Sequence, residues 1–156
     1  GTTTLEIARL LPGKRQVKVI TTSLSIVSEL QFAADIELIL LGGFLRDGSP
    51  DLHGPLTEQN LDMFQADIAF VGGDAVDKDG GIYTNDLRIL SLDRKMASIT
   101  KHLIVVADSS KFSRQAMCKV FKPQDYQTLI SDYSLDQKLV RDMEKKGINI
   151  ELAPVR

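Results

Sequence analysis

Short apolar runs alternate with amphipathic runs along most of this 156-residue chain, and this alternation limits the folds available to it. Residues 36–41 are nearly all apolar and stop at a pair of glycines, as a buried strand does. Residues 24–32, just before them, carry apolar side chains at helical spacing instead. Buried strands that alternate with helices are typical of an α/β protein. We therefore expect a three-layer α/β/α sandwich with a mainly parallel sheet, formed as a single domain over residues 1–156.

Helical spacing and turn residues place the other expected elements. We expect helices over residues 5–11, 24–32, 55–63, 89–98 and 135–146. We expect strands over residues 17–20, 36–41, 67–71, 103–107, 118–121, 128–130 and 148–152. Residues 74–86 are rich in Gly and Asp, and we expect them to form a loop.

The composition argues against several classes of function. A net charge of −2 argues against a basic nucleic-acid-binding face on this chain. The single cysteine, Cys118, permits no internal disulfide, which is typical of a reducing compartment, so we expect a cytoplasmic protein. His53 and His102 lie far apart without ligand-like spacing, so we expect no metal site, and we expect no cofactor. No apolar run approaches membrane-spanning length, so we expect no membrane contact.

Small polar or charged residues follow several of the expected strands. These strand ends are residues 21–23, 42–43, 72–74, 108–111 and 131–132. In open α/β sheets, ligands bind beyond the carboxyl ends of the strands, so side chains from distant parts of the chain can meet there. Gly, Ser and Asp are also ordinary loop formers, and plain turns are the alternative interpretation.

The residue types at these strand ends indicate an anionic, hydroxylated ligand. Lys111 supplies a positive charge, and Ser110 supplies a short donor. Asp74 and Asp108 can accept hydrogen bonds from sugar hydroxyls or from a lysine. The sequence therefore suggests a phosphorylated sugar or polyol, although a solvated surface lysine is the simpler interpretation of Lys111.

The segment Gly1-Thr2-Thr3-Thr4 precedes an amphipathic run. Glycine lets a backbone approach a ligand, and a helix start presents unpaired N–H groups, so the segment can cradle a phosphate. A plain helix cap fits this segment equally well.

No catalytic residue emerges from the sequence. We find no Gly-x-Ser-x-Gly elbow, no Walker loop and no Gly-x-Gly-x-x-Gly motif. An isomerase can work with one carboxylate as its base, so Asp74 and Asp108 keep an enzymatic alternative open.

Seven short motifs follow one another along the chain, at residues 1–4, 19–23, 41–43, 54–55, 67–74, 81–84 and 107–112. In this order they resemble the C-terminal effector-sensing domain of DeoR-type bacterial transcriptional regulators. The resemblance covers nearly the whole chain, and residues 107–112 closely match the family's Asp-x-Ser-Lys-Phe signature.

The resemblance implies a fold shared with sugar-phosphate isomerases and CoA transferases. It implies a sensor rather than an enzyme, with a phosphorylated sugar or related metabolite as effector. It also implies an N-terminal winged helix-turn-helix that binds DNA outside this sequence, a repressor function, and assembly as a homodimer or homotetramer. The effector-binding residues that it implies are Gly1, Thr2, Thr3, Thr22, Gly43, Asp74, Asp108, Ser110 and Lys111. A sugar-phosphate isomerase or amino-sugar-phosphate deaminase of the same fold, or an assembly module with an empty crevice, are the alternatives.

The chain departs from the family pattern at three places. Thr22 stands where the family usually has Asn. Ile89 replaces an acidic residue, which leaves Arg94 or Lys95 to supply the charge expected in that helix. The family's first strand and an acidic residue would precede Gly1.

Overall fold

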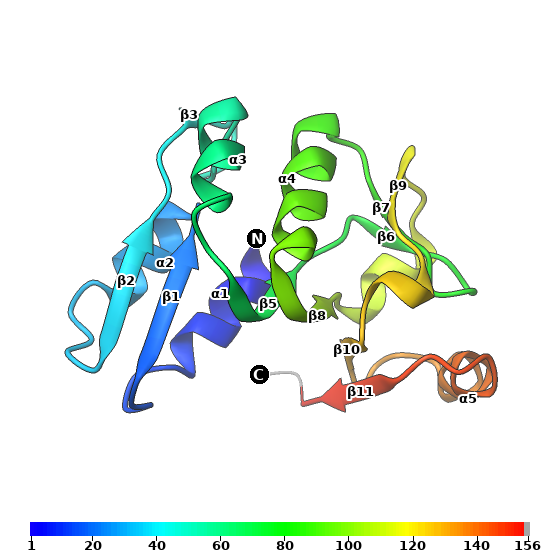
Figure 1. Cartoon of the computed structure of the whole chain (residues 1–156). Helices are drawn as coiled ribbons and strands as arrows, with labels where there is room; N and C mark the ends of the chain where they lie inside the picture. The colour runs from blue at the N-terminus through cyan, green and yellow to red at the C-terminus, as the bar shows by residue number, and fades with distance from the viewer. Residues whose placement is uncertain (155–156) are drawn as a thin grey trace. The chain divides into compact units, whose positions relative to one another are not determined.

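The computed structural model describes residues 1–154. The chain divides into two compact units, residues 1–64 (unit 1) and residues 65–156 (unit 2), whose elements Figure 1 labels. Both units combine helices with parallel strands, which confirms the expected α/β class with a mainly parallel sheet. A single sensor domain over the whole chain stays a prediction.

Unit 1 is built on a parallel pair of strands. Its elements are α1 (Thr2–Arg9), β1 (Val17–Thr21), α2 (Leu24–Leu30), β2 (Ile36–Leu40), β3 (Phe44–Leu45), β4 (Leu52–His53) and α3 (Pro55–Leu61). β1 and β2 run in register from Val17 opposite Ile36 to Thr21 opposite Leu40. β3 and β4 form an antiparallel hairpin.

The core of unit 1 is small. Ala8 of α1, Leu30 of α2 and Ile36 of β2 are buried together, and the half-buried Val19 and Leu38 pack against them. The amphipathic spacing of α1 and α2 therefore brings both helices onto the strands as the sequence predicts. The alternation of side chains places Lys18 and Glu37 on the opposite face, where both are exposed.

Unit 2 contains a larger sheet. Its elements are β5 (Ala66–Val71), β6 (Ala75–Val76), β7 (Ile82–Thr84), α4 (Leu87–Ser98), β8 (Thr100–Val106), the 3₁₀ helix η1 (Ser109–Ser113), β9 (Cys118–Phe121), the 3₁₀ helix η2 (Pro123–Asp125), β10 (Thr128–Asp132), α5 (Gln137–Lys145) and β11 (Ile150–Ala153). Four parallel strands lie in the order β11-β10-β8-β5, and β6, β7 and β9 form an antiparallel sheet.

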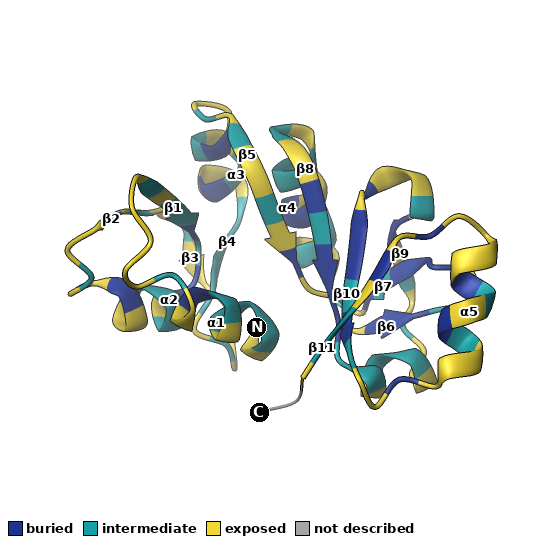
Figure 2. Cartoon of the chain, turned by 90° about the horizontal axis from the view of Figure 1, so that it is seen from below, coloured by how far each residue is buried: buried dark blue, intermediate teal, exposed yellow. Residues whose placement is uncertain are grey.

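A continuous apolar core fills unit 2, as the dark blue strands and helix faces in Figure 2 show. Val105 and Leu129 on neighbouring strands, Ile82 of β7 and Met143 of α5 are almost completely inaccessible to solvent. These residues come from nearly all elements of the unit, so the core ties the parallel and the antiparallel sheets together.

The expected loop over residues 74–86 is wrong, because it contains the β6–β7 hairpin. The Asp77 carboxylate organises the turn: its Oδ1 accepts hydrogen bonds from the backbone N–H groups of Asp79 and Gly81, each at 2.8 Å. Its Oδ2 accepts from the Tyr83 hydroxyl at 2.7 Å. Strands of two and three residues are too short to show an alternation of apolar and polar side chains in the sequence. The hydrogen bonds of the Asp77 side chain fix the turn of this hairpin instead.

Several helix boundaries also differ from the expected ones. α1 begins at Thr2 and ends at Arg9, and α4 begins at Leu87. Asp86 caps α4 by accepting a hydrogen bond from the Arg88 N–H at 3.0 Å. Asp136 caps α5 in the same way, so that helix begins at Gln137. Capping side chains, rather than the first apolar residue, set the starts of α4 and α5.

Candidate functional site

In unit 1, the carboxyl ends of β1 and β2 lie side by side. The Leu41 N–H donates to the Thr21 carbonyl oxygen at 2.9 Å, which extends the strand pairing to the end of β1. The Thr22 carbonyl oxygen accepts from the Leu52 N–H at 2.8 Å, so β4 also reaches this end. The predicted residues Thr22 and Gly43 therefore follow neighbouring strands of the same unit, and both are half-buried.

Gly43 fits against a buried threonine. The Thr57 side chain is fully buried, and its hydroxyl donates to the Gly42 carbonyl oxygen at 2.7 Å. A Cβ at Gly43 would overlap Thr57 Oγ1 and lie 2.6 Å from the His53 carbonyl oxygen. Packing thus accounts for a glycine at position 43 without a ligand.

A second glycine supports this corner of unit 1. Gly54 has φ +105°, a conformation that side-chain-bearing residues rarely adopt, and it leads directly into Pro55 at the start of α3. α3 in turn carries Thr57, so the Gly54-Pro55 motif places the buried hydroxyl.

The residues of the predicted phosphate cradle lie at the start of α1. Thr2 is exposed and Thr3 is half-buried, and the first turn contains no acidic residue that would repel an anion. The Thr4 hydroxyl donates to the Gly1 carbonyl oxygen at 2.9 Å. The first N–H groups of a helix have no partner within it, so those of α1 can contact a ligand.

In unit 2, Asp74 is held at the carboxyl end of β5. Its Oδ2 accepts from the Thr84 hydroxyl and from the Asn85 N–H, each at 2.9 Å. The Asn85 side chain accepts in turn from the Met117 N–H at 3.0 Å. Asp74 is exposed, and one of its oxygens therefore links two loops while the other is available to a ligand.

The turn after β8 carries the other three predicted residues of unit 2. The Asp108 carboxylate accepts from the Ser110 N–H at 3.0 Å and so caps η1. Ser110 is exposed, which leaves its hydroxyl accessible. η1 also contacts β6, the strand that directly follows Asp74, so the structure brings both regions together within unit 2.

Asp132 fixes this turn from the neighbouring strand. Its carboxylate accepts from the Ser109 N–H at 2.7 Å and from the Ser134 N–H at 2.9 Å. Burial alone would raise the pKa of the Asp132 carboxyl, but these hydrogen bonds outweigh it and lower the pKa below its usual value. The first amides of η1 are therefore occupied by carboxylates, and an anion would depend on side-chain donors.

Lys111 is the cationic donor at this turn. Its side chain is half-buried, and within the described range 1–154 its ammonium group has no hydrogen-bond or ion-pair partner. An ammonium group held near a surface without a counter-ion attracts an anion more strongly than one already paired.

Arg94 does not supply a free charge. Its guanidinium donates to the carbonyl oxygens of Lys119 at 2.9 Å and Val120 at 3.3 Å, which attaches α4 to β9. Lys95 also has a partner. Neither Arg94 nor Lys95 is therefore free to bind an effector.

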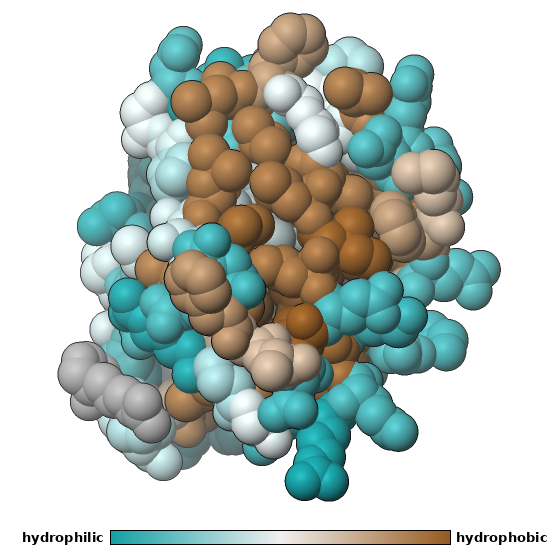
Figure 3. Space-filling view, turned by 90° about the vertical axis from the view of Figure 1, so that its left-hand side faces the viewer, coloured by the Kyte–Doolittle hydropathy of each residue, from teal (hydrophilic) through white to brown (hydrophobic). Residues whose placement is uncertain are grey.

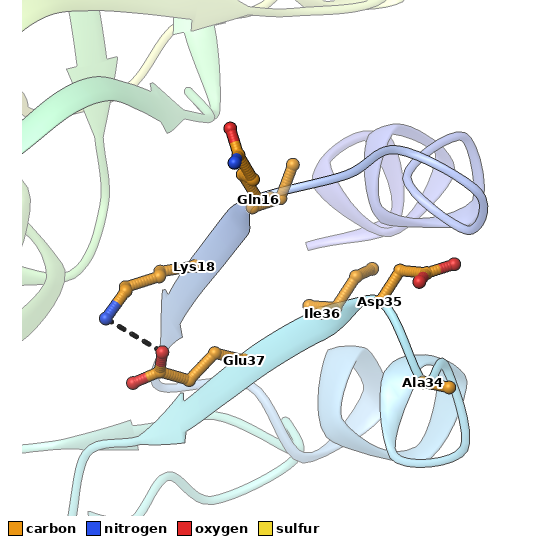
Figure 4. A pocket seen from close by; sticks show the side chains of 7 residues that line it. Gln16, Lys18, Ala34, Asp35, Ile36 and Glu37 are labelled. Carbon is orange, nitrogen blue, oxygen red and sulfur yellow. Dashed lines mark ion pairs between the residues drawn. The ribbon is translucent and has the colours of Figure 1, made fainter.

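Two hollows lie near the strands. The first, of about 440 Å³, lies at the amino ends of β1 and β2, where Lys18 and Glu37 form an ion pair of 2.8 Å (Figure 4). It lies at the opposite end of these strands from Thr22 and contains no predicted site residue. The second, of about 320 Å³, lies between η1 and the start of α5 and includes Ser110.

The sequence interpretation assigned no site role to two residues that shape the site. Asp132 follows a predicted strand together with Ser131, and its position at a strand end was the available signal. Thr57 had no sequence signal, because its partner Gly42 lies fifteen residues away.

Over residues 1–154, no group of three or more His, Cys, Asp or Glu side chains could hold a metal ion. In the same part of the chain, no helix has both the length and the apolar character needed to cross a bilayer.

Comparison with known proteins connects this geometry to a family. The chain is 34% identical over 152 residues to a putative aga operon transcriptional repressor of Escherichia coli O157:H7, an alignment that covers 97% of this chain and 56% of that protein. It is 29% identical to the glycerol-3-phosphate regulon repressor of Escherichia coli K12, with 75% of this chain and 46% of that protein covered. The regulator GlpR of Haloferax volcanii is 29% identical, with 96% and 58% covered. The chain spans about half the length of these curated relatives.

A solved structure, ribose 5 phosphate isomerase A from Neisseria gonorrhoeae, aligns with a TM-score of 0.40 and 15% identity over 72% of this chain and 52% of that chain. The family model of the DeoR C-terminal sensor domain matches residues 1–133. This model describes a sensor domain, which confirms the expectation of a sensing rather than a catalytic chain, and the three relatives are named as transcriptional regulators or repressors. Because this family model matches well over half of the chain, the chain belongs to the family of DeoR C-terminal sensor domains.

Proposed function

We propose that this sensor domain binds a phosphorylated sugar or related metabolite and thereby controls DNA binding by the full-length regulator. One observation carries the proposal: among residues 1–154 the half-buried Lys111 has no counter-ion, and it directly follows the exposed Ser110 in the same turn. Lys111 and Ser110 bind the phosphate, and Asp74 and Asp108 accept hydrogen bonds from the hydroxyl groups of the ligand.

The wider context supports the same class of ligand. One relative is named as the glycerol-3-phosphate regulon repressor, and glycerol 3-phosphate is a phosphorylated polyol. The relatives are nearly twice as long as this chain, so we place DNA binding in an N-terminal helix-turn-helix of the full-length protein. We further propose that this protein is a cytoplasmic repressor and a homo-oligomer.

For the unit 1 residues, a role in effector binding is still predicted from the family resemblance. Gly1, Thr2, Thr3 and Thr22 supply backbone or hydroxyl donors for an anion. Gly43 packs closely against Thr57 and His53, so we expect it to influence ligand binding only through the shape of its turn.

Thermal unfolding in the presence of candidate ligands tests the proposal. The probes are inorganic phosphate, glycerol 3-phosphate and glucose 6-phosphate, each beside its unphosphorylated counterpart where one exists. A probe at 100 times its Kd stabilises the protein by roughly 2.7 kcal/mol, which gives a clear rise in Tm. We expect Lys111→Met to remove the rise and the exposed Lys138→Met to retain it.

Two results would contradict the proposal in different ways. The absence of a shift with every phosphorylated probe, in a folded sample, argues against this class of effector. A full shift in Lys111→Met argues against the placement of the phosphate. A parallel measurement on Thr3→Val tests the unit 1 part of the prediction, because that change removes a hydroxyl from an accessible position.

A further inference from the structure

The outer edge of β2 is a free sheet edge. β2 pairs with β1 on one side, and none of the strands in the described residues pairs with its other side. The Leu41 N–H points toward β1, where it donates to the Thr21 carbonyl oxygen. Because these groups alternate along a strand, Leu38 and Leu40 point their backbone N–H and C=O groups outward. β2 therefore presents unpaired donors and acceptors to another strand.

This edge lacks the features that usually prevent such pairing. Natural proteins protect free edges with lysine, proline or bulges, and β2 contains none of these. Its one charged side chain, Glu37, is in an ion pair with Lys18 at 2.8 Å. The other strand of the pair differs, because β1 contains Lys18 and follows Lys14-Arg15. The two edges of this sheet are thus chemically unequal.

Apolar side chains surround the β2 edge. Leu40 is 42% exposed, and Phe44 and Leu45 of the following hairpin are 68% and 60% exposed. Figure 3, which views the molecule from the side of β2, shows hydrophobic side chains gathered across the middle of this face. Contiguous apolar surface of this kind marks interaction sites on folded proteins.

We propose that β2 pairs antiparallel with β2 of a second copy of this chain, across a two-fold axis at Leu38. In this register Leu38 exchanges backbone hydrogen bonds with its symmetry mate, and the Leu40 N–H donates to the second copy's Ile36 carbonyl oxygen. Glu37 lies opposite the second copy's Ile39, so no like charges face each other.

A two-fold interface uses each β2 edge once, so the pairing closes as a dimer and leaves no β2 edge for further chains. The second copy is the occupant that the edge fits best, because its own edge has the matching apolar side chains and its own Glu37 is already neutralised by Lys18. This inference rests on the proposed homo-oligomer but is independent of the effector.

Molar mass by light scattering after gel filtration tests the pairing on the 1–156 chain. We expect the wild-type chain to have the mass of two copies at micromolar concentration. Leu40→Lys introduces an ammonium group opposite an apolar residue in each copy, and we expect the dimer dissociation constant to rise by roughly tenfold or more. Leu10→Lys makes the same change at a 54% exposed leucine outside β2, and we expect it to stay dimeric.

Amide hydrogen exchange provides a second measurement that identifies the edge itself. The Leu38 and Leu40 amides should exchange more slowly as the concentration rises, whereas in Leu40→Lys the same protection of Leu38 should require a correspondingly higher concentration. Protection of buried Leu30 in the variant shows that unit 1 remains folded.

The possible failures are distinguishable. A monomeric wild-type chain overturns this inference and the proposed homo-oligomer of this domain, while the ligand-induced Tm shift would still support the effector. A dimer that survives Leu40→Lys, or one in which the Leu38 amide gains no protection, places the interface elsewhere and overturns the β2 pairing alone.

Discussion

Unit 1 and unit 2 both combine parallel strands with helices, yet they bury very different amounts of apolar surface. The main core cluster of unit 1 contains Ala8, Leu30 and Ile36, whereas that of unit 2 draws buried residues from both of its sheets, α5 and several loops. A small core supplies little stability per residue. The comparison indicates that unit 2 is stabilised by its core and that unit 1 depends more on individual polar contacts, such as the Thr57 hydrogen bond.

The largest expected effect tests whether the two units are separate in stability. Leu129 is completely buried in unit 2, and Leu129→Ala should lower the free energy of unfolding by about 3–5 kcal/mol because it leaves a cavity. Hydrogen exchange in urea, followed separately for residues 1–64 and 65–154, measures the loss. We expect Leu129→Ala to reduce protection from exchange in unit 2 only. The matching change in unit 1, Leu30→Ala, should reduce protection in unit 1 only. Equal loss of protection in both units after either change would show one cooperative structure.

An intermediate effect tests how far the stability of unit 1 depends on the contact between Gly43 and Thr57. Gly43→Ala places a methyl group against Thr57 and His53, so we expect a loss of about 1–3 kcal/mol in the unfolding free energy of unit 1. Gly42→Ala is the matched control, because a Cβ there meets no atom within 4 Å. Urea unfolding of both variants checks the prediction, and equal losses would show that overlap with Thr57 is not the cause.

The smallest expected effect concerns a buried polar contact of unit 2. The Tyr126 hydroxyl donates to the Gly80 carbonyl oxygen at 2.8 Å, and burial raises the pKa of Tyr126 to about 12. Tyr126→Phe removes the donor and should lower the unfolding free energy at neutral pH by about 1–2 kcal/mol.

The same tyrosine predicts a pH dependence. Its pKa in the folded state exceeds the unfolded value of 10, so the folded state retains the proton more strongly. The resulting stabilisation is fully present below pH 10 and is lost as the pH rises through 12, with a total of at most about 2 kcal/mol after allowance for solvent screening. Urea unfolding between pH 8 and 12 should show this loss in the wild-type chain but not in Tyr126→Phe. Tyr133→Phe is the control and should still show the loss, because Tyr133 is exposed in the wild-type chain.

The fold was largely readable from the sequence because its main elements have strong periodicity. The strands around Val105 and Leu129 are apolar runs, and the helix over Leu87–Ser98 has apolar residues at helical spacing, so local pattern was sufficient. The β6–β7 hairpin was not readable, because its strands are very short and the Asp77 side chain fixes the turn. The starts of α4 and α5 differ from the expected ones for a related reason, since their capping carboxylates lie outside the periodic pattern.

The candidate site was only partly readable from the sequence. Asp74, Asp108, Ser110 and Lys111 occupy strand ends of unit 2, as sequence order and sheet topology predict. The bonding of the η1 amides to Asp108 and Asp132 was not visible in the sequence, because it depends on a neighbouring strand. The packing role of Gly43 likewise depends on Thr57, a contact between distant parts of the chain.

The hydroxyl of Thr57 changes how variants at the paired glycines should be interpreted. A substitution at position 43 that weakens the response to a metabolite would be scored as a damaged ligand contact, although displacement of α3 would produce the same result. A reciprocal change separates the two explanations: Thr57→Ala removes the hydroxyl beside position 43 but leaves the His53 carbonyl oxygen 2.6 Å from the added Cβ, so it should partly rescue a packing defect and leave a true contact defect unrepaired. Any survey of effector specificity in this chain therefore needs that double variant before Gly43 is assigned to the ligand.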